Sequence, residues 1–155
     1  HLIGHLQSNK VRKILPLCAL IHSVDSVELA RDLSRIAGEL ALRARVLLQV
    51  NAAGDEAKFG FPVGVVKSVF AEILALPGIE VRGFMTVPPF EEDVEKVRPH
   101  FAALRRLRDE LEAIHGVKLP ELSMGMNHDF RVAIKEGATM VRVGSSIFGR
   151  RDYGK

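Results

Sequence analysis

The sequence predicts an α/β fold in the form of a (β/α)8 barrel of the TIM type, of which this chain holds an incomplete part. Short apolar runs rich in branched residues alternate with longer amphipathic stretches along the 155 residues. This alternation is typical of parallel strands joined by helical crossovers. The best phosphate-type loop, Gly144-Ser145-Ser146, follows the last apolar run. Barrels often bind phosphate there, whereas a doubly wound sheet usually carries its glycine fingerprint after the first strand.

Six apolar runs are predicted to be strands because they are short, β-branched and bounded by turn residues. They cover residues 2–4, 19–22, 46–51, 79–85, 121–124 and 139–144. A complete barrel has eight strands and roughly 250 residues. We therefore expect the first two strand–helix units to precede His1, and we expect residues 1–155 to form one barrel domain that is truncated at its N-terminus.

Four amphipathic stretches between these runs are predicted to be helices. Asp25 and Ser26 are good N-cap residues for the first, and Pro62 suits the first turn of the second. The longest covers about 94–114, and the last follows Asp129. The side chains expected to face the core are Leu29, Leu33, Ile36, Ala37 and Leu40; Val65, Val69 and Ile73; Val97, Phe101, Leu104, Leu107, Leu111 and Ile114; and Phe130, Ala133 and Ile134.

The composition and charge of the chain argue against several classes of function. The net charge of +3 is small and its basic residues are scattered, which favours an anionic small ligand over nucleic acid. A single cysteine, Cys18, excludes an internal disulfide framework and suits a reducing, cytoplasmic location. No apolar run approaches the roughly 20 residues needed to cross a bilayer, so no membrane association is expected. The six histidines lack metal-ligand spacing, so we predict no metal site.

The ends of the last two predicted strands carry the candidate site residues. Arg142 shares a strand face with Met140 and Gly144 by the two-residue period, and a buried guanidinium needs an acceptor. Spacing alone favours a structural salt bridge with Asp or Glu over a ligand contact. The loop of residues 123–127 and the loop of residues 144–149 lie on neighbouring strands, where they form either a shared phosphate cup or two ordinary turns.

Five ordered blocks of the chain resemble the pyridoxal 5′-phosphate (PLP) homeostasis protein family. The first is His1-Leu2-Ile3-Gly4-His5-Leu6-Gln7-Ser8-Asn9-Lys10. The others are Gln49-Val50-Asn51 with Lys58-x-Gly60-Phe61; Gly83-Phe84-Met85-Thr86-Val87-Pro88; Leu122-Ser123-Met124-Gly125-Met126 with Asp129 and Ala133-Ile134; and residues 141–151, Val-Arg-Val-Gly-Ser-Ser-Ile-Phe-Gly-Arg-Arg. No single block is specific, but their order along the whole chain is.

The resemblance implies a barrel like the N-terminal domain of alanine racemase, with PLP at the C-terminal face of the strands. It places Arg142 beside the pyridine nitrogen. It places around the phosphate and the pocket the residues Gly144, Ser145, Met124, Gly125, Met126, Asn127, Ile3 and Met85, together with His1 and Gly4. Asn127 stands where the family commonly has serine, and Ser145 where threonine is usual. The family's Schiff-base lysine lies on the first strand, which we expect to precede His1, so no catalytic residue is assigned here.

The function that this resemblance implies is PLP binding in intracellular vitamin B6 homeostasis, by a carrier or regulator without robust turnover. An arginine at the pyridine nitrogen leaves that nitrogen unprotonated and makes the ring a weaker electron sink. PLP-dependent apoenzymes are the expected partners, and the full-length protein is expected to be a monomer. Three alternatives stay open: a PLP-dependent amino-acid racemase, for which the one tyrosine, Tyr153, is poorly placed; a barrel for another phosphorylated metabolite; and an inactive fragment.

Overall fold

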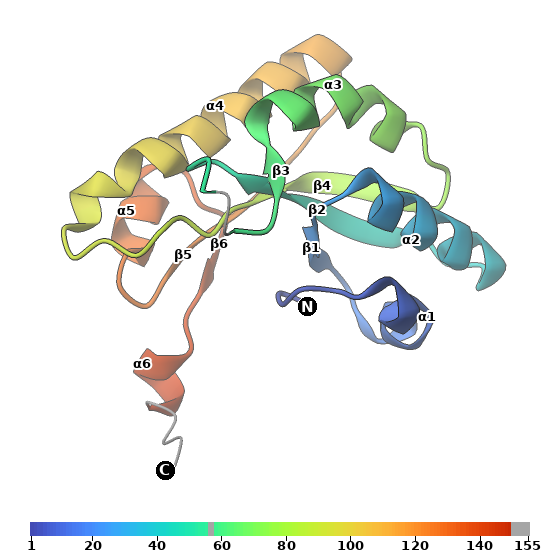
Figure 1. The fold of residues 1–155 in the computed structure, drawn as a ribbon, viewed down its shortest axis with the longest axis horizontal. Helices are drawn as coiled ribbons and strands as arrows, with labels where there is room; N and C mark the ends of the chain where they lie inside the picture. The colour runs from blue at the N-terminus through green and yellow to red at the C-terminus, as the bar shows by residue number, and fades with distance from the viewer. Residues whose placement is uncertain (56–57, 150–155) are drawn as a thin grey trace.

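The computed structural model describes residues 1–55 and 58–149 (Figure 1); Arg150, Arg151 and Tyr153 therefore lie outside the described residues. The elements in chain order are η1 (Ser8–Lys10), α1 (Val11–Ile14), η2 (Leu15–Leu17), β1 (Ile21–Val24), α2 (Val27–Glu39), β2 (Ala44–Asn51), β3 (Phe61–Pro62), α3 (Val63–Leu74), β4 (Ile79–Met85), η3 (Val94–Lys96), α4 (Arg98–His115), β5 (Glu121–Met126), α5 (Phe130–Lys135), β6 (Met140–Arg142) and α6 (Ser145–Phe148). No helix among the described residues is long and apolar enough to span a membrane.

The strands form one parallel sheet in the order β1-β2-β4-β5-β6, with the two-residue β3 paired to β2. Five of the six predicted runs are strands. The first, residues 2–4, is reduced to a single parallel bridge between Leu2 and Ile21. The strand β3 was not predicted, because Phe61-Pro62 is too short to show a two-residue period. The short helices over residues 8–17 were also not predicted, since each spans one turn or less.

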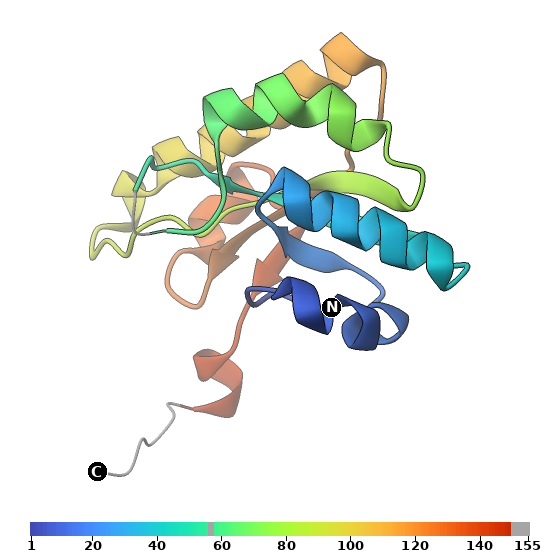
Figure 2. The same ribbon diagram turned by 45° about the vertical axis from the view of Figure 1, so that its right-hand side comes forward.

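Consecutive helices pack against one another around the outside of the sheet, in the pairs α1 with α2, α2 with α3, α3 with α4, and α4 with α5. Figures 1 and 2 show this succession on one side of the sheet, while α6 projects away from it. A parallel sheet whose crossover helices follow in order on one side is the arrangement of a barrel segment. A doubly wound sheet would carry helices on both faces.

The main core lies between the sheet and these helices. Alternate strand residues face it, among them Val46, Leu48 and Phe84. The stripe on α4 is buried as predicted from Val97 to Leu111, but Ile114 at its end is exposed. Two helix faces were predicted only in part, since Ile73 and Ala133 are buried and Val69 packs against the core as expected, whereas Val65 and Ile134 are exposed. On α3 the buried residues are Val66, Phe70 and Ile73, with Val65 exposed; on α5 they are Val132 and Ala133, with Phe130 only half-buried and Ile134 exposed.

A second, smaller apolar cluster lies on the opposite face of the sheet. It contains Leu20, Leu47 and Met85, with Val87 and Met140 packed against it. These residues alternate along their strands with residues of the main core, as the pleat requires. Both faces of the sheet are therefore apolar in part, which fits strands with helices outside and a packed interior inside.

Ser26→Ala is expected to lower the free energy of unfolding by about 1 kcal/mol. Ser26 is the N-cap of α2, and its Oγ accepts a hydrogen bond from the Leu29 N–H at 3.2 Å. Chemical denaturation of the chain measures the loss. Ser26→Asp is the matched control, because a carboxylate accepts the same bond and favours the positive helix end. Equal losses in both variants would contradict the capping role.

Candidate ligand-binding site

A chain of buried polar side chains crosses the inner face of the sheet. Arg142 on β6 donates from Nη1 to the Ser123 Oγ on β5 at 2.8 Å. The Ser123 hydroxyl and the His22 Nδ1 on β1 are 2.9 Å apart, and the His22 Nε2 is 3.0 Å from the His1 Nδ1. Because the Ser123 oxygen accepts from Arg142, its own proton is free to be donated to Nδ1 of His22. Strands β1, β5 and β6 are thereby linked through their side chains.

Arg142 is buried without a carboxylate partner. Its Nη2 donates to the Thr86 carbonyl oxygen at 2.8 Å, and its side chain forms no salt bridge within residues 1–55 and 58–149. Burial lowers the pKa of Arg142 to about 10, opposed in part by the charge of Asp129. The guanidinium is therefore charged at neutral pH and is held by neutral acceptors. The salt bridge favoured by spacing alone was wrong, and N–H donors remain for a ligand.

His22 is one of the site residues that sequence reasoning missed, together with Ser123 and Thr86. It is 2% exposed, and burial followed by the nearby charge of Arg142 lowers its pKa to about 4. A neutral His22 protonated at Nε2 fits the chain, since Nδ1 then accepts from Ser123 and Nε2 donates to His1. One signal was present in the sequence, because His22 and Leu20 share a face of the predicted strand 19–22 by the two-residue period.

The two glycine loops are joined by one side chain. The Asn127 Oδ1 accepts hydrogen bonds from the Gly144 N–H and the Ser146 N–H, both at 3.1 Å. The loop that carries Asn127 packs closely on α5. Gly125 has a φ of +92°, and a Cβ there would lie 2.6 Å from the Ala133 Cβ. The Met126 N–H also donates to the Asp129 Oδ1 at 2.6 Å.

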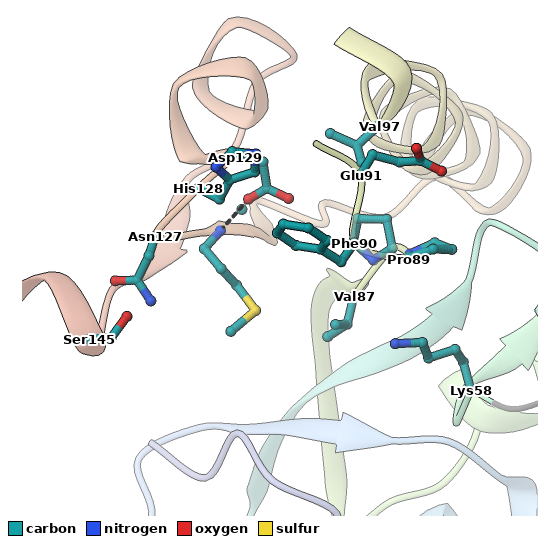
Figure 3. Close-up of a pocket in the computed structure, with 13 residues that line it drawn as sticks. Lys58, Val87, Pro89, Phe90, Glu91, Val97, Asn127, His128, Asp129 and Ser145 are labelled. Atoms are coloured by element: carbon teal, nitrogen blue, oxygen red, sulfur yellow. Dashed lines mark hydrogen bonds between the residues drawn. The ribbon is translucent and has the colours of Figure 1, made fainter. Parts of the chain in front are cut away.

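A cavity of about 540 Å³ opens beside these loops (Figure 3). Asn127 and Ser145 lie on one side of it and Lys58 lies across it, next to Val87. Its lining residues are Lys58, Val87, Pro88, Pro89, Phe90, Glu91, Val97, Gly125, Met126, Asn127, His128, Asp129 and Ser145. The wall is mostly apolar, with polar groups concentrated at the two loops, which is typical of a small-molecule site.

The structure brings most predicted site residues together and separates three. Those gathered at the C-terminal ends of β5 and β6 are Arg142, Gly144, Ser145, Gly125, Met126 and Asn127. Met85 lies in the small inner cluster, and Ile3 is 42% exposed on the first segment. The side chain of Met124 is fully buried in the main core on the helix side, so only its backbone can contact a ligand on the inner face. Within the described ranges, no three His, Cys, Asp or Glu residues are placed to hold a metal ion.

A parallel sheet with outer helices and hydrogen-bond donors at the C-terminal ends of its strands is typical of a barrel-type protein that binds a small ligand. The comparison with known sequences identifies the family. Residues 1–152 match the sequence model of the family described as "Alanine racemase, N-terminal domain", and the chain belongs to this family. The chain is 48% identical over 153 residues to the pyridoxal phosphate homeostasis protein of Aquifex aeolicus, and 38% identical over 165 residues to the protein of that name from Homo sapiens. The resemblance to the PLP-homeostasis proteins is thus confirmed.

These comparisons also show how much of the relatives the chain covers. It spans 67% of the Aquifex aeolicus protein and 59% of the human one, while 99% and 100% of the chain are matched. Among solved structures, PipY of Synechococcus elongatus PCC7942 with PLP bound is 38% identical, with a TM-score of 0.88 over 94% of this chain and 68% of that one. The alanine racemase of Clostridium difficile 630, at 20% identity and a TM-score of 0.79, shares the fold over 96% of this chain and 38% of that one.

Proposed function

We propose that this chain forms the PLP-binding part of a protein of intracellular vitamin B6 homeostasis. The observation that carries the proposal is the buried guanidinium of Arg142, which is charged and faces the inner side of the sheet next to two glycine loops. Within residues 1–55 and 58–149 it forms no salt bridge with a carboxylate. PLP offers a neutral pyridine nitrogen as acceptor and a phosphate as anion. A relative of 38% identity has been solved with PLP bound.

The donors of the site fit these two groups. We assign Arg142 to the pyridine nitrogen, and Gly144, Ser145 and the backbone from Met124 to Asn127 to the phosphate, with Ile3 and Met85 around the pocket. Backbone N–H groups of glycine loops suit phosphate oxygens. An arginine is a donor only, so the nitrogen opposite it stays unprotonated. When bound, PLP supplies a reactive aldehyde, and an unprotonated ring favours holding it over carbanion chemistry. This supports a carrier or regulator rather than a racemase.

We also propose that the full-length protein closes this sheet into an eight-stranded barrel. The support is the length of the relatives, the bridge from Leu2 to β1 at one edge of the sheet, and β6 at the other. In this proposal the first two strand–helix units precede His1 and carry the family's Schiff-base lysine, and residues 1–155 belong to one domain. The location is the cytoplasm, the full-length protein is a monomer, and PLP-dependent apoenzymes receive the cofactor.

A PLP titration of this chain beside a version extended with the N-terminal segment of a relative tests the proposal. We expect this chain to bind PLP reversibly, and to bind pyridoxal at least about tenfold more weakly, because the phosphate contacts are lost. After borohydride reduction and peptide mapping, only the extended protein is expected to retain PLP, at a lysine of the added segment. Equal affinity for PLP and pyridoxal, or trapping on a lysine of residues 1–155, would contradict the assignment.

A further inference from the structure

We propose that Asn127 sets the affinity of this site for phosphate by occupying the Gly144 and Ser146 N–H groups until a phosphate displaces the Asn127 side chain. The inference rests on the proposed function and deepens it. The feature is the Asn127 clasp, which we define as the two hydrogen bonds from the Gly144 and Ser146 N–H groups to the single Oδ1 of Asn127, each 3.1 Å long. A phosphate placed on the Gly144 loop needs these same N–H groups.

The clasp joins two segments that approach from different strands. Asn127 follows β5, and its partners Gly144 and Ser146 follow β6. The Asn127 side of the clasp has a fixed backbone, because Gly125 packs against α5 and the Met126 N–H is bound by Asp129. Both Asn127 and Ser145 line the cavity, so a ligand in the cavity lies directly beside the clasp (Figure 3).

Competition between the Asn127 carboxamide and a phosphate sets the affinity of the site for phosphate. The Asn127 oxygen is a neutral acceptor, whereas a phosphate oxygen is charged, and charge-assisted hydrogen bonds are roughly twice as strong as neutral ones. A phosphate ester therefore gains by displacing the carboxamide, which is then free to donate from its Nδ2. A neutral ring compound such as pyridoxal has no comparable acceptor and leaves the clasp closed. The side chain thus lowers the affinity of the site for phosphate and leaves the binding of a neutral ring compound unchanged.

Serine at this position is expected to remove this effect. Its side chain is shorter than that of asparagine and does not reach both N–H groups from the same backbone position. Asn127→Ser is therefore expected to release the Gly144 and Ser146 amides. Asn127→Asp keeps an oxygen in place, adds a negative charge and strengthens the clasp against an incoming anion. The two variants change the clasp in opposite directions with small changes in volume.

Amide hydrogen exchange measured by NMR on the ligand-free chain tests the clasp itself. The Gly144 and Ser146 amides are expected to exchange about tenfold faster in Asn127→Ser than in the wild type, since each loses one hydrogen bond. Asn9→Ser, an exposed asparagine on η1, is the matched control and is expected to leave both amides unchanged. Unchanged exchange in Asn127→Ser would overturn the inference.

A titration with inorganic phosphate, followed through the same two amide signals, tests the competition. Asn127→Ser is expected to bind phosphate about tenfold more tightly than the wild type, and Asn127→Asp at least about tenfold more weakly. Equal affinities, or no phosphate binding by any variant, would overturn the inference. The proposed function fails separately: a chain that shows these differences for phosphate but does not bind PLP keeps the clasp and loses the PLP assignment.

Discussion

Replacing Arg142 with methionine is expected to weaken PLP binding by about a hundredfold, which corresponds to roughly 3 kcal/mol. Arg142 is the buried cation of the site, and its hydrogen bonds go to Ser123 and to the Thr86 carbonyl. A charged donor toward the pyridine nitrogen in a buried position is worth more than an exposed one. Equilibrium dialysis of PLP against the wild type and the variant measures the loss.

The fold is expected to tolerate this substitution, so that the loss of binding can be read as a loss of contact. Methionine is unbranched, and it lies next to the apolar cluster that contains Met85 and Met140. Removing a buried charge offsets part of the cost of leaving the Thr86 carbonyl without its donor. Thermal unfolding checks this point. Arg35→Met on α2, an exposed arginine paired with Asp32 and Glu39, is the matched control and is expected to bind PLP like the wild type.

The substitution Arg142→Lys tests whether PLP binding depends on the positive charge of Arg142 or on the planar shape of its guanidinium. Lysine keeps the positive charge but lacks the planar fork that contacts Ser123 and Thr86 at once. Its affinity for PLP is expected to lie between those of the wild type and Arg142→Met. A lysine variant that binds like the wild type would show that charge alone is recognised. Wild-type affinity in Arg142→Met would contradict the role of Arg142 altogether.

The sequence predicted the parts of the fold that depend on local pattern. Five strands, the helices α2, α3, α4 and α5 and the stripe on α4 follow from periodicity and capping. On α3 and α5 the predicted core residues Val65 and Ile134 are exposed. The error arose where several apolar residues adjoin, as in Val63, Val65, Val66 and Val69, because one face then cannot be told from the next by period alone. By contrast, the two-residue period alone predicts that the side chains of Ser123 and Met124 point to opposite faces of the sheet.

The loops of the site could be predicted from the sequence, but the hydrogen bonds that join its residues could not. The motifs placed Arg142, Asn127 and Gly144 at the ends of neighbouring strands, which is where the structure has them. The partners of Arg142 lie directly after β4 (Thr86) and on β5 (Ser123). His22 comes from β1, at the opposite edge of the sheet from β6. These contacts depend on strand order and on the curvature of the sheet, which no local pattern encodes. The carbonyl of Thr86, in particular, has no side-chain signature.

Lowering the pH from about 6.5 to about 4 is expected to reduce the free energy of unfolding through His22. The pKa of His22 falls from its ordinary value of 6.5 to about 4, because burial and then the Arg142 charge disfavour the imidazolium. Between these values the unfolded chain binds a proton that the folded chain rejects, so stability rises with pH across this window and is lost as the pH falls through it. Allowing for solvent screening, the loss is about 1–3 kcal/mol.

His22→Gln isolates this contribution from the other titrating groups. Glutamine does not titrate, yet its carboxamide can accept from Ser123, so the variant is expected to lose the extra slope between pH 6.5 and 4 and to retain the fold. Urea denaturation at several pH values measures the slope for both proteins. Asn9→Gln on η1, an exposed substitution that removes no titrating group, is the matched control and is expected to keep the wild-type slope. Parallel stability curves for the wild type and His22→Gln would mean that the pKa of His22 is the same in the folded and the unfolded chain, and would contradict its burial as a neutral imidazole beside the Arg142 charge.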